Sequence, residues 1–402
     1  MSAFTPVATL PLDRQPTFRR DAVPQDRWGR VLWVVFILVV VLKQFGNPSR
    51  VDILTTYHSA SCRWLLSEGL YDGTGGGFIY LPQFAAAYTP FALLPFDLGC
   101  ALVRALNIGI FAIGVWRFAQ LAGRRSGNLP MWLVSVLSMA LIWTSAEAGQ
   151  MTLAMGAMML LAIVDLADQR WWRAALWLTI GLALKPLIIV LVLLAAVLYP
   201  RISWRLAIGV VAIGVFPFLT QRPGYVCSQY LACVQMFDDA SRRAISQSGE
   251  FAQLFWMLKS AGIDVPDSGQ TALRLLAAVL TLVLCWWAQR KVDSSRFAVL
   301  LFTLAACYLM LFNPRTERNT YSLLAPALAV FIAQAVEHRY LKRAAFLLGL
   351  VVLLLVSYPL GNLLTGGPTV WIKPLLCVVF LTFVLLHFWQ ETAGARSAKQ
   401  RV

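Results

Sequence analysis

Long apolar stretches dominate the chain and restrict it to a fold that lies within a membrane. About a dozen runs approach the ~20 residues that a helix needs to cross a bilayer, and charged residues, prolines or glycines separate them. Of the 402 residues, 59% are hydrophobic and 13% are charged, and the mean hydropathy is +0.68. No single water-soluble core can bury this much apolar surface, so these values exclude a soluble enzyme. The sequence therefore predicts an all-α polytopic integral membrane protein with about 12 transmembrane helices.

The expected spans divide the chain into two tails and one membrane domain. The first tail, 1–28, is rich in arginine and is not followed by a signal-peptide cleavage site, so we expect it to lead into an uncleaved helix. The membrane domain covers 29–389, and the second tail covers 390–402. Lys185-Pro186 separates the fifth and sixth spans, which we expect to form one broken or tilted pair. The approximate spans are 29–46, 98–121, 129–147, 151–168, 171–185, 187–200, 204–220, 271–289, 296–312, 321–337, 343–360 and 370–389.

The stretch 78–96 decides the topology. It is apolar, but it carries three prolines that an uninterrupted spanning helix tolerates poorly. If it only dips into the membrane face, all the basic clusters lie on the side of the N-terminus, which the positive-inside rule makes the cytoplasm. These clusters are Arg117/Arg124/Arg125, Arg170/Arg173, Arg201/Arg205, Arg290/Lys291/Arg296, Arg339/Lys342/Arg343 and Arg396/Lys399/Arg401. The net charge of +15 is then a topology signal with a secondary attraction to membrane lipids, and it does not indicate nucleic-acid binding.

With both termini in the cytoplasm of a plasma-membrane protein, two long segments face the outside, at about 47–97 and 221–270. The first contains an amphipathic helix at 52–67, which we expect to lie flat on the outer surface of the membrane. The second could also carry a surface helix. Cys227 and Cys233 are close enough in sequence to pair if their segment faces an oxidising space. No cysteine spacing predicts a metal site, and no fingerprint predicts a nucleotide or other cofactor.

Polar residues from distant parts of the chain fall on the outer face under this topology, where groups at membrane depth are costly and suggest function. Asp52 can accept a proton from a sugar hydroxyl, although it is also a good N-cap for the helix that follows it. Tyr57 lies on the same predicted helix. Tyr80 lies in Phe78-Ile79-Tyr80-Leu81-Pro82, which either exposes backbone polar groups to a ligand or forms a turn with an interfacial aromatic.

Two further candidate groups lie between predicted helices. The sequence Glu147-Ala148-Gly149-Gln150 is either a tight turn or a polar site in which Glu147 and Gln150 bind an acceptor or orient another side chain. Lys185 interrupts an otherwise apolar run. Its ammonium either reaches the outer headgroups or binds a lipid-linked phosphate.

The last candidate group is the charged turn at 313–319. Arg315 and Arg318 can grip a phosphate with forked donors, and Glu317 can hold one of them in place. Charged helix caps would produce the same pattern. The expected meeting of this turn with the other polar groups at one face favours a site.

Several short motifs follow one another over roughly 50–330. They are Asp52-x4-Tyr57, Gly69-Leu70-Tyr71, Phe78-x-Tyr80-x-Pro82, Leu93-Leu94-Pro95, Gly149-Gln150 and Gly181-x-x-x-Lys185-Pro186. This ordered set resembles glycosyltransferase family 87, the polyprenol-dependent glycosyltransferases of the GT-C fold. Many relatives carry a histidine in the last outer loop and this chain does not, which leaves the role of that loop and the identity of the sugar open.

The resemblance implies a GT-C-like bundle with an active site on its extracytoplasmic face. Such an enzyme moves a sugar, commonly mannose or a pentose, from a polyprenyl-phosphate donor to a lipid or glycan acceptor, with inversion. Asp52 would be the general base, and Lys185 with Arg315 or Arg318 would stabilise the leaving phosphate in place of a metal.

Two other classes of protein remain open at this point. A transporter or flippase of a lipid-linked anionic substrate would also use cations within the membrane, although the polar groups gather at one face and no inverted repeat is visible. In a non-catalytic assembly subunit, the same residues would serve only as helix caps.

Overall fold

A computed structural model of the chain describes residues 24–46, 53–71, 77–127, 129–246, 251–365 and 371–399. Throughout these residues the chain is helical and contains no strand, which confirms the predicted all-α class. In chain order the helices are α1 (Pro24–Phe45), α2 (Ile53–Leu65), α3 (Pro82–Ala92), α4 (Phe96–Ser126), α5 (Met131–Glu147), α6 (Thr152–Ala167), α7 (Trp171–Leu184), η1 (Pro186–Ile188), α8 (Ile189–Leu198), α9 (Pro200–Val215), η2 (Phe216–Leu219), α10 (Pro223–Ser246), α11 (Leu254–Ser260), α12 (Asp267–Gln289), α13 (Ser294–Phe312), η3 (Arg318–Leu324), α14 (Ala325–Glu337), α15 (Leu341–Thr365) and α16 (Ile372–Lys399).

Eight helical segments among the described residues are long and apolar enough to cross a membrane. They are Arg27–Phe45, Phe96–Arg124, Pro200–Leu219, Asp267–Gln289, Ser294–Phe312, Arg318–Glu337, Leu341–Leu364 and Ile372–Thr392. Four of the expected spans correspond to shorter apolar helices of 10–17 residues, namely α5, α6, α7 and the η1–α8 segment. The chain is thus a polytopic helical membrane protein. Of the roughly twelve transmembrane helices that we expected, eight have the length and composition of a full span.

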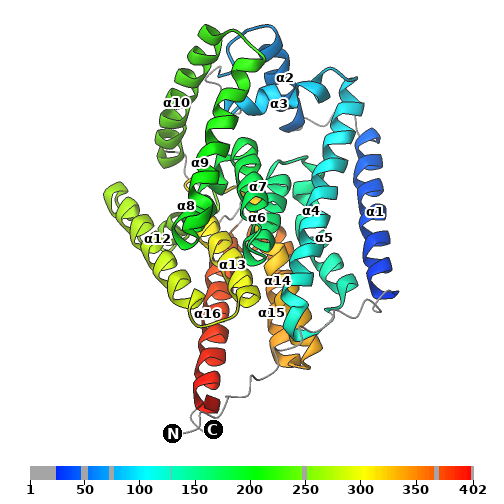
Figure 1. Ribbon diagram of the computed structural model, residues 1–402, viewed down its shortest axis with the longest axis vertical. Helices are drawn as coiled ribbons and strands as arrows, with labels where there is room; N and C mark the ends of the chain where they lie inside the picture. Colours follow the sequence, from blue (N-terminus) through cyan, green and yellow to red (C-terminus); the bar gives the residue numbers. More distant parts are fainter. Residues whose placement is uncertain are drawn as a thin grey trace, which may run out of the picture.

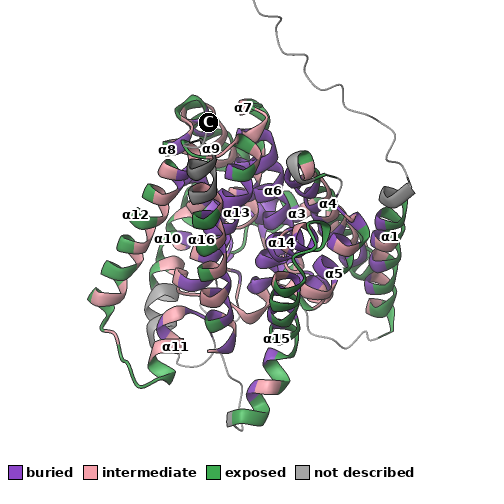
Figure 2. Cartoon of the chain, turned by 90° about the horizontal axis from the view of Figure 1, so that it is seen from below, coloured by how far each residue is buried: buried purple, intermediate pink, exposed green. Residues whose placement is uncertain are grey.

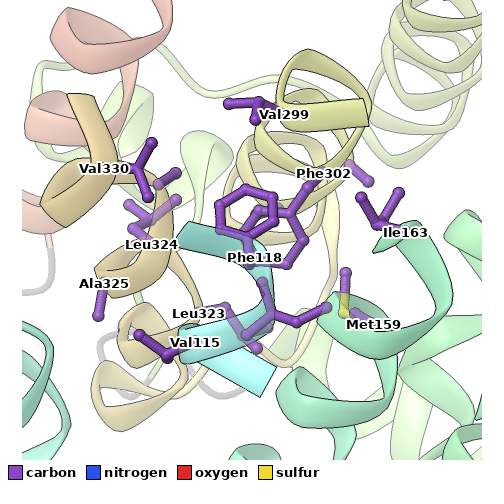
Figure 3. Packing of buried hydrophobic residues seen from close by; sticks show 14 of the residues in the cluster. Val115, Phe118, Met159, Ile163, Val299, Phe302, Leu323, Leu324, Ala325 and Val330 are labelled. Carbon is purple, nitrogen blue, oxygen red and sulfur yellow. The ribbon is translucent and has the colours of Figure 1, made fainter. Parts of the chain in front are cut away.

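Neighbouring helices enclose the short helix α6. It packs against α4, α7 and α13, and nearly every side chain from Thr152 to Leu166 is buried. Around it the core is apolar, and the rings of Phe118 and Phe302 lie with their centroids 5.0 Å apart (Figure 3). A helix surrounded by protein does not need to match the thickness of the lipid, which explains why α6 can be short.

Burial separates the inner helices from those at the periphery. In the most apolar 18-residue stretch of α13, 78% of the residues are buried, whereas in that of α12 only 11% are buried (Figure 2). The exposed side chains of α12 include Leu276, Val279 and Leu280. Such a surface suits contact with lipid tails rather than water.

The expected break between the fifth and sixth spans is confirmed. Helix α7 ends at Leu184, Lys185 is extended with φ −154° and ψ 115°, and Pro186 begins the short helix η1. Proline favours an extended residue before it and has no N–H to continue the helix. The break places the Lys185 side chain at a helix end inside an apolar region.

The stretch 78–96 does not form a spanning helix. Its helix, α3, has 11 residues and ends before Leu93-Leu94-Pro95, after which α4 begins. Eleven residues of α-helix extend only about 16 Å, roughly half the thickness of the hydrocarbon core. Helices α2 and α3 pack together across one end of the molecule (Figure 1).

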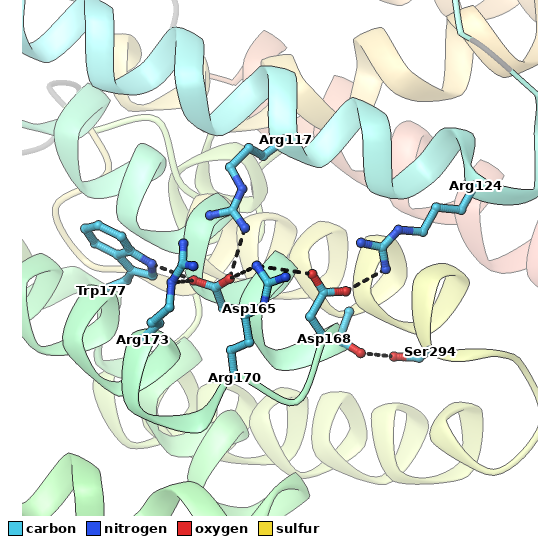
Figure 4. Close-up of polar contacts among 9 residues, drawn as sticks. Arg117, Arg124, Asp165, Asp168, Arg170, Arg173, Trp177 and Ser294 are labelled. Atoms are coloured by element: carbon cyan, nitrogen blue, oxygen red, sulfur yellow. Dashed lines mark hydrogen bonds and ion pairs between the residues drawn. The ribbon is translucent and has the colours of Figure 1, made fainter. Parts of the chain in front are cut away.

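Near the end of α4 that is far from α3, arginines surround a buried carboxylate. Asp165 is 0% exposed, and it accepts from Arg117 at 3.0 Å and from the Trp177 indole at 2.8 Å (Figure 4). Arg173 also pairs with it, at 3.2 Å. This cluster was not predicted. The signal was an acidic residue within an apolar run, Leu160-Leu161-Ala162-Ile163-Val164-Asp165.

Candidate functional site

Helix α2 is amphipathic, as the sequence predicted, and its buried face packs against α3. Its buried residues Leu54, Tyr57, Ala60, Ser61 and Trp64 recur at helical spacing. The next residues, Leu65 and Leu66, are exposed by 44% and 69%. The helix ends at Leu65, two residues before the predicted end at 67.

The hydroxyl groups of Tyr57 and Tyr80 form a hydrogen bond of 2.6 Å beneath α2. Tyr57 is 0% exposed, and its ring also contacts Phe84 with a centroid distance of 4.9 Å. Burial raises the pKa of both hydroxyls well above 10, and the carboxylate of Glu317 raises both pKa values further. The pair is therefore neutral at physiological pH and can donate a hydrogen bond.

The turn between α5 and α6 touches α2. Gly149 has a φ of +62°, and a Cβ on it would lie 2.7 Å from the side chain of Leu54. Only glycine fits both the left-handed backbone and this close contact. The turn presents Gln150, whose amide nitrogen donates to the Glu317 carboxylate at 2.9 Å, while its Oε1 is buried and has no hydrogen-bond partner among the described residues.

Lys185 meets the same group from the α7 break. Its ammonium donates to the hydroxyl of Thr152 at 2.8 Å and interacts electrostatically with Glu317. Glu317 thereby links Tyr57, Tyr80, Gln150 and Lys185, residues that are up to 260 positions from it in the chain. We name these five residues the Glu317 cluster.

Arg315 and Arg318 flank Glu317 but face aromatic rings. The Arg315 guanidinium lies 5.4 Å from the ring centroid of Phe251, and that of Arg318 lies 4.8 Å from the ring centroid of Tyr358. Among the described contacts the Glu317 carboxylate accepts from the Gln150 amide, and its expected pairing with an arginine stays a prediction. The Nη1 atom of Arg318 is buried and lacks a hydrogen-bond partner in the described part of the chain.

Sequence reasoning missed a further cation beside Arg318. The ammonium of Lys373, at the start of α16, donates to the Arg318 carbonyl at 2.9 Å. This ammonium also interacts electrostatically with the Arg318 side chain, and two cations that interact form a potential site for an anion. The signal in the sequence was a lysine directly before an apolar span, the same signal that drew attention to Lys185.

Glu147 belongs to a different set of contacts. Its carboxylate pairs with Lys43 of α1, and its backbone carbonyl accepts from the Arg104 side chain at 3.2 Å. Arg104 also donates to Gln44. These contacts tie α1, α4 and α5 together close to the Gln150 turn.

Asp52, the expected base, lies outside the described residues. The residue after Asp52, Ile53, begins α2.

Cys227 and Cys233 are free thiols on α10, so their possible pairing is not found. Six residues along a helix place two side chains about 120° apart around its axis, which keeps the two sulfur atoms from meeting. Among the described residues, no group of three or more His, Cys, Asp or Glu side chains is placed to hold a metal.

Comparison with known proteins places the chain in a family. A comparison with curated protein sequences finds no match. The sequence profile of glycosyltransferase family 87 matches residues 78–314, which is more than half of the chain and includes Tyr80, Gln150 and Lys185. The apolar helices agree with a membrane glycosyltransferase. The chain belongs to glycosyltransferase family 87.

Proposed function

We propose that this membrane glycosyltransferase transfers a sugar from a polyprenyl monophosphate to a lipid or glycan acceptor, with inversion at the anomeric carbon. Mannose or a pentose is the proposed sugar. The observation that carries the proposal is the Glu317 cluster, in which a carboxylate accepts a hydrogen bond from an amide and interacts electrostatically with an ammonium at a helix break and with two neutral hydroxyls. Such a set can bind both a sugar and a phosphate.

The proposed reaction needs one base and a cationic phosphate site. Asp52 takes the proton of the acceptor hydroxyl as its oxygen attacks the anomeric carbon. The bond from that carbon to the phosphate oxygen breaks, and its electron pair leaves with polyprenyl phosphate. The phosphate carries one negative charge while it is esterified to the sugar and gains a second on leaving. Lys185, Arg315 and Arg318 stabilise this developing charge.

The remaining residues position the substrate. The Tyr57–Tyr80 pair donates its one remaining O–H to a sugar hydroxyl, and Gln150 offers its unpartnered oxygen to a donor on the substrate. Glu317 holds the Gln150 amide and balances the charge of Lys185. Glu147 contributes by fixing the turn that carries Gln150.

We further propose that the site faces outward from a plasma membrane, with both termini in the cytoplasm and a GT-C-like arrangement of helices. The positive-inside rule supports this orientation, since arginines gather around Asp165 near the end of α4 that is far from α3. A single cysteine at Ser67 should react with an impermeant maleimide from outside intact cells, and one at Arg170 should not. Reaction of both, or of the second only, would contradict the orientation.

Release of the donor lipid tests the function directly. Full-length protein in nanodiscs is given a polyprenyl-phosphate sugar with a radiolabelled lipid, together with membrane lipid extract as the source of acceptor. We expect acceptor-dependent release of polyprenyl phosphate, which Asp52→Asn abolishes and Glu68→Gln, a change at an exposed carboxylate after α2, leaves intact. Movement of the intact donor across a vesicle membrane without cleavage would instead indicate a flippase.

A further inference from the structure

A cavity of about 440 Å³ opens between α11 and α12, outside the Glu317 cluster. Its volume lies within the range of roughly 300–1,000 Å³ that small-molecule sites occupy. Pro314 forms part of its rim, so the cavity borders the turn that carries Arg315, Glu317 and Arg318.

Two buried polar atoms in the lining of this cavity lack partners. Gln253 is 4% exposed, and neither its Oε1 nor the indole Nε1 of Trp256 has a hydrogen-bond partner in the described part of the chain. A buried polar group without a partner is destabilising, so such atoms suit a ligand. The indole N–H only donates and the amide oxygen only accepts, whereas a hydroxyl group satisfies either one.

The charges around the cavity balance one another. Lys259 pairs with Asp264 at 3.7 Å, and Arg274 interacts electrostatically with Asp267. Two basic and two acidic side chains leave no net charge to attract an anion. The ammonium of Lys259 lies over the Trp256 ring, and Val265 and Pro266 give the cavity an apolar wall. A neutral ligand with several hydroxyls and an apolar face fits this lining, and a saccharide has that character.

Hydrogen bonds connect the cavity walls to the turn at 313–319 and to the residue before it. The N–H of Ala252, next to Gln253, donates to the Thr316 carbonyl at 2.8 Å, and the Tyr321 hydroxyl donates to the Ala252 carbonyl at 3.0 Å. On the other wall, Arg274 donates to the Phe312 carbonyl at 3.1 Å. Both walls of the cavity are therefore hydrogen-bonded to the turn that carries Glu317 or to the residue just before it.

We infer that this cavity is a saccharide subsite that holds a sugar ring of the acceptor beside the donor site. The inference rests on the proposed transferase function and extends it, because it states that the acceptor carries a saccharide. Gln253 and Trp256 are its specificity-determining residues. They form hydrogen bonds with hydroxyl groups of the sugar ring and take no part in the chemistry at the anomeric carbon.

Photo-crosslinking tests the subsite without requiring turnover. Full-length protein in nanodiscs is irradiated with diazirine-bearing alkyl mannoside and alkyl arabinoside, and the labelled peptides are mapped by mass spectrometry. We expect saturable labelling within 253–274 that free methyl glycosides displace. Gln253→Leu and Trp256→Phe should each weaken half-saturation about fivefold, as expected for the loss of one hydrogen bond. Gln253→Leu removes an unpartnered polar atom and should leave folding intact.

The matched control is Trp286→Phe, at a tryptophan that is 48% exposed near the other end of α12, and it should leave labelling unchanged. Labelling elsewhere, labelling insensitive to both substitutions, or displacement by inorganic phosphate alone would overturn the subsite. A protein that binds the glycosides as expected but releases no polyprenyl phosphate would refute the transferase proposal and retain the saccharide site. An active transferase whose acceptor KM is unchanged in Gln253→Leu would do the reverse.

Discussion

Replacing Lys185 with methionine gives the most informative test of the Glu317 cluster. The substitution keeps an unbranched apolar stem and removes the ammonium that donates to Thr152 at 2.8 Å and faces Glu317. If this ammonium stabilises the second charge that the phosphate gains on leaving, its contribution is larger in the transition state than in the bound donor. Its loss must then lower kcat and kcat/KM together.

The expected size of the effect follows from the type of contact. Removing one fixed donor from a developing anion costs about 2.7–4 kcal/mol, which is about 100- to 1,000-fold in kcat. Thr152→Val removes only the hydroxyl that orients Lys185 and retains the ammonium. The loss of one neutral hydrogen bond is about 1 kcal/mol, so we expect about a fivefold decrease in kcat for this variant.

Initial rates of polyprenyl phosphate release, measured over a range of donor concentrations, separate these cases. Lys342→Met, at an exposed lysine in α15, controls for the loss of positive charge as such. The reasoning is refuted if Lys185→Met turns over within about threefold of the wild type, or if only its donor KM rises, because uniform binding of donor and transition state would then be the correct description.

Three further substitutions test other parts of the argument. Asp52→Asn should lower transfer about 100- to 10,000-fold while the protein still inserts into the membrane, and near-normal turnover would remove the assignment as base. Tyr57→Phe and Tyr80→Phe should each destabilise the fold by about 1–3 kcal/mol, whereas the double variant should lose less than the sum, as a double-mutant cycle of thermal unfolding would report. Asp165→Asn leaves several arginines facing a buried neutral amide and should destabilise the protein by about 3 kcal/mol. Arg170→Ala, at a half-exposed partner of the same carboxylate, should cost at most about 1 kcal/mol in the same assay, and equal losses would show that the cluster is not centred on Asp165.

Local sequence patterns predicted the helical class because their physical causes are local. The spacing of Leu54, Tyr57 and Trp64 predicted an amphipathic helix, and Pro186 predicted the break after α7, since a proline acts on its own backbone and on the residue before it. The same local view overestimated the number of full-length spans. Local patterns do not show that α6 is surrounded by protein, and in that position the thickness of the lipid sets no minimum length for the helix.

The chemistry of the candidate site was only partly visible in the sequence. Composition and charge marked Gln150, Lys185 and Glu317 individually, because a polar group at membrane depth is costly wherever it occurs. They did not reveal that the Gln150 amide donates to Glu317, or that Lys373 joins Arg318. Such pairings depend on which helix ends meet, and residues far apart in the chain carry no local signal of one another.

By itself, the sequence determined that this chain is a polytopic helical membrane protein, because hydrophobicity acts residue by residue. Tertiary packing alone decided the partners: it buried Asp165 among arginines, placed the tyrosine pair beneath α2, and left polar atoms of Gln253 and Trp256 without partners in the lining of a cavity. The physical reason is that a hydrogen bond or ion pair requires two groups to meet in space, and the folded arrangement of the helices sets that distance.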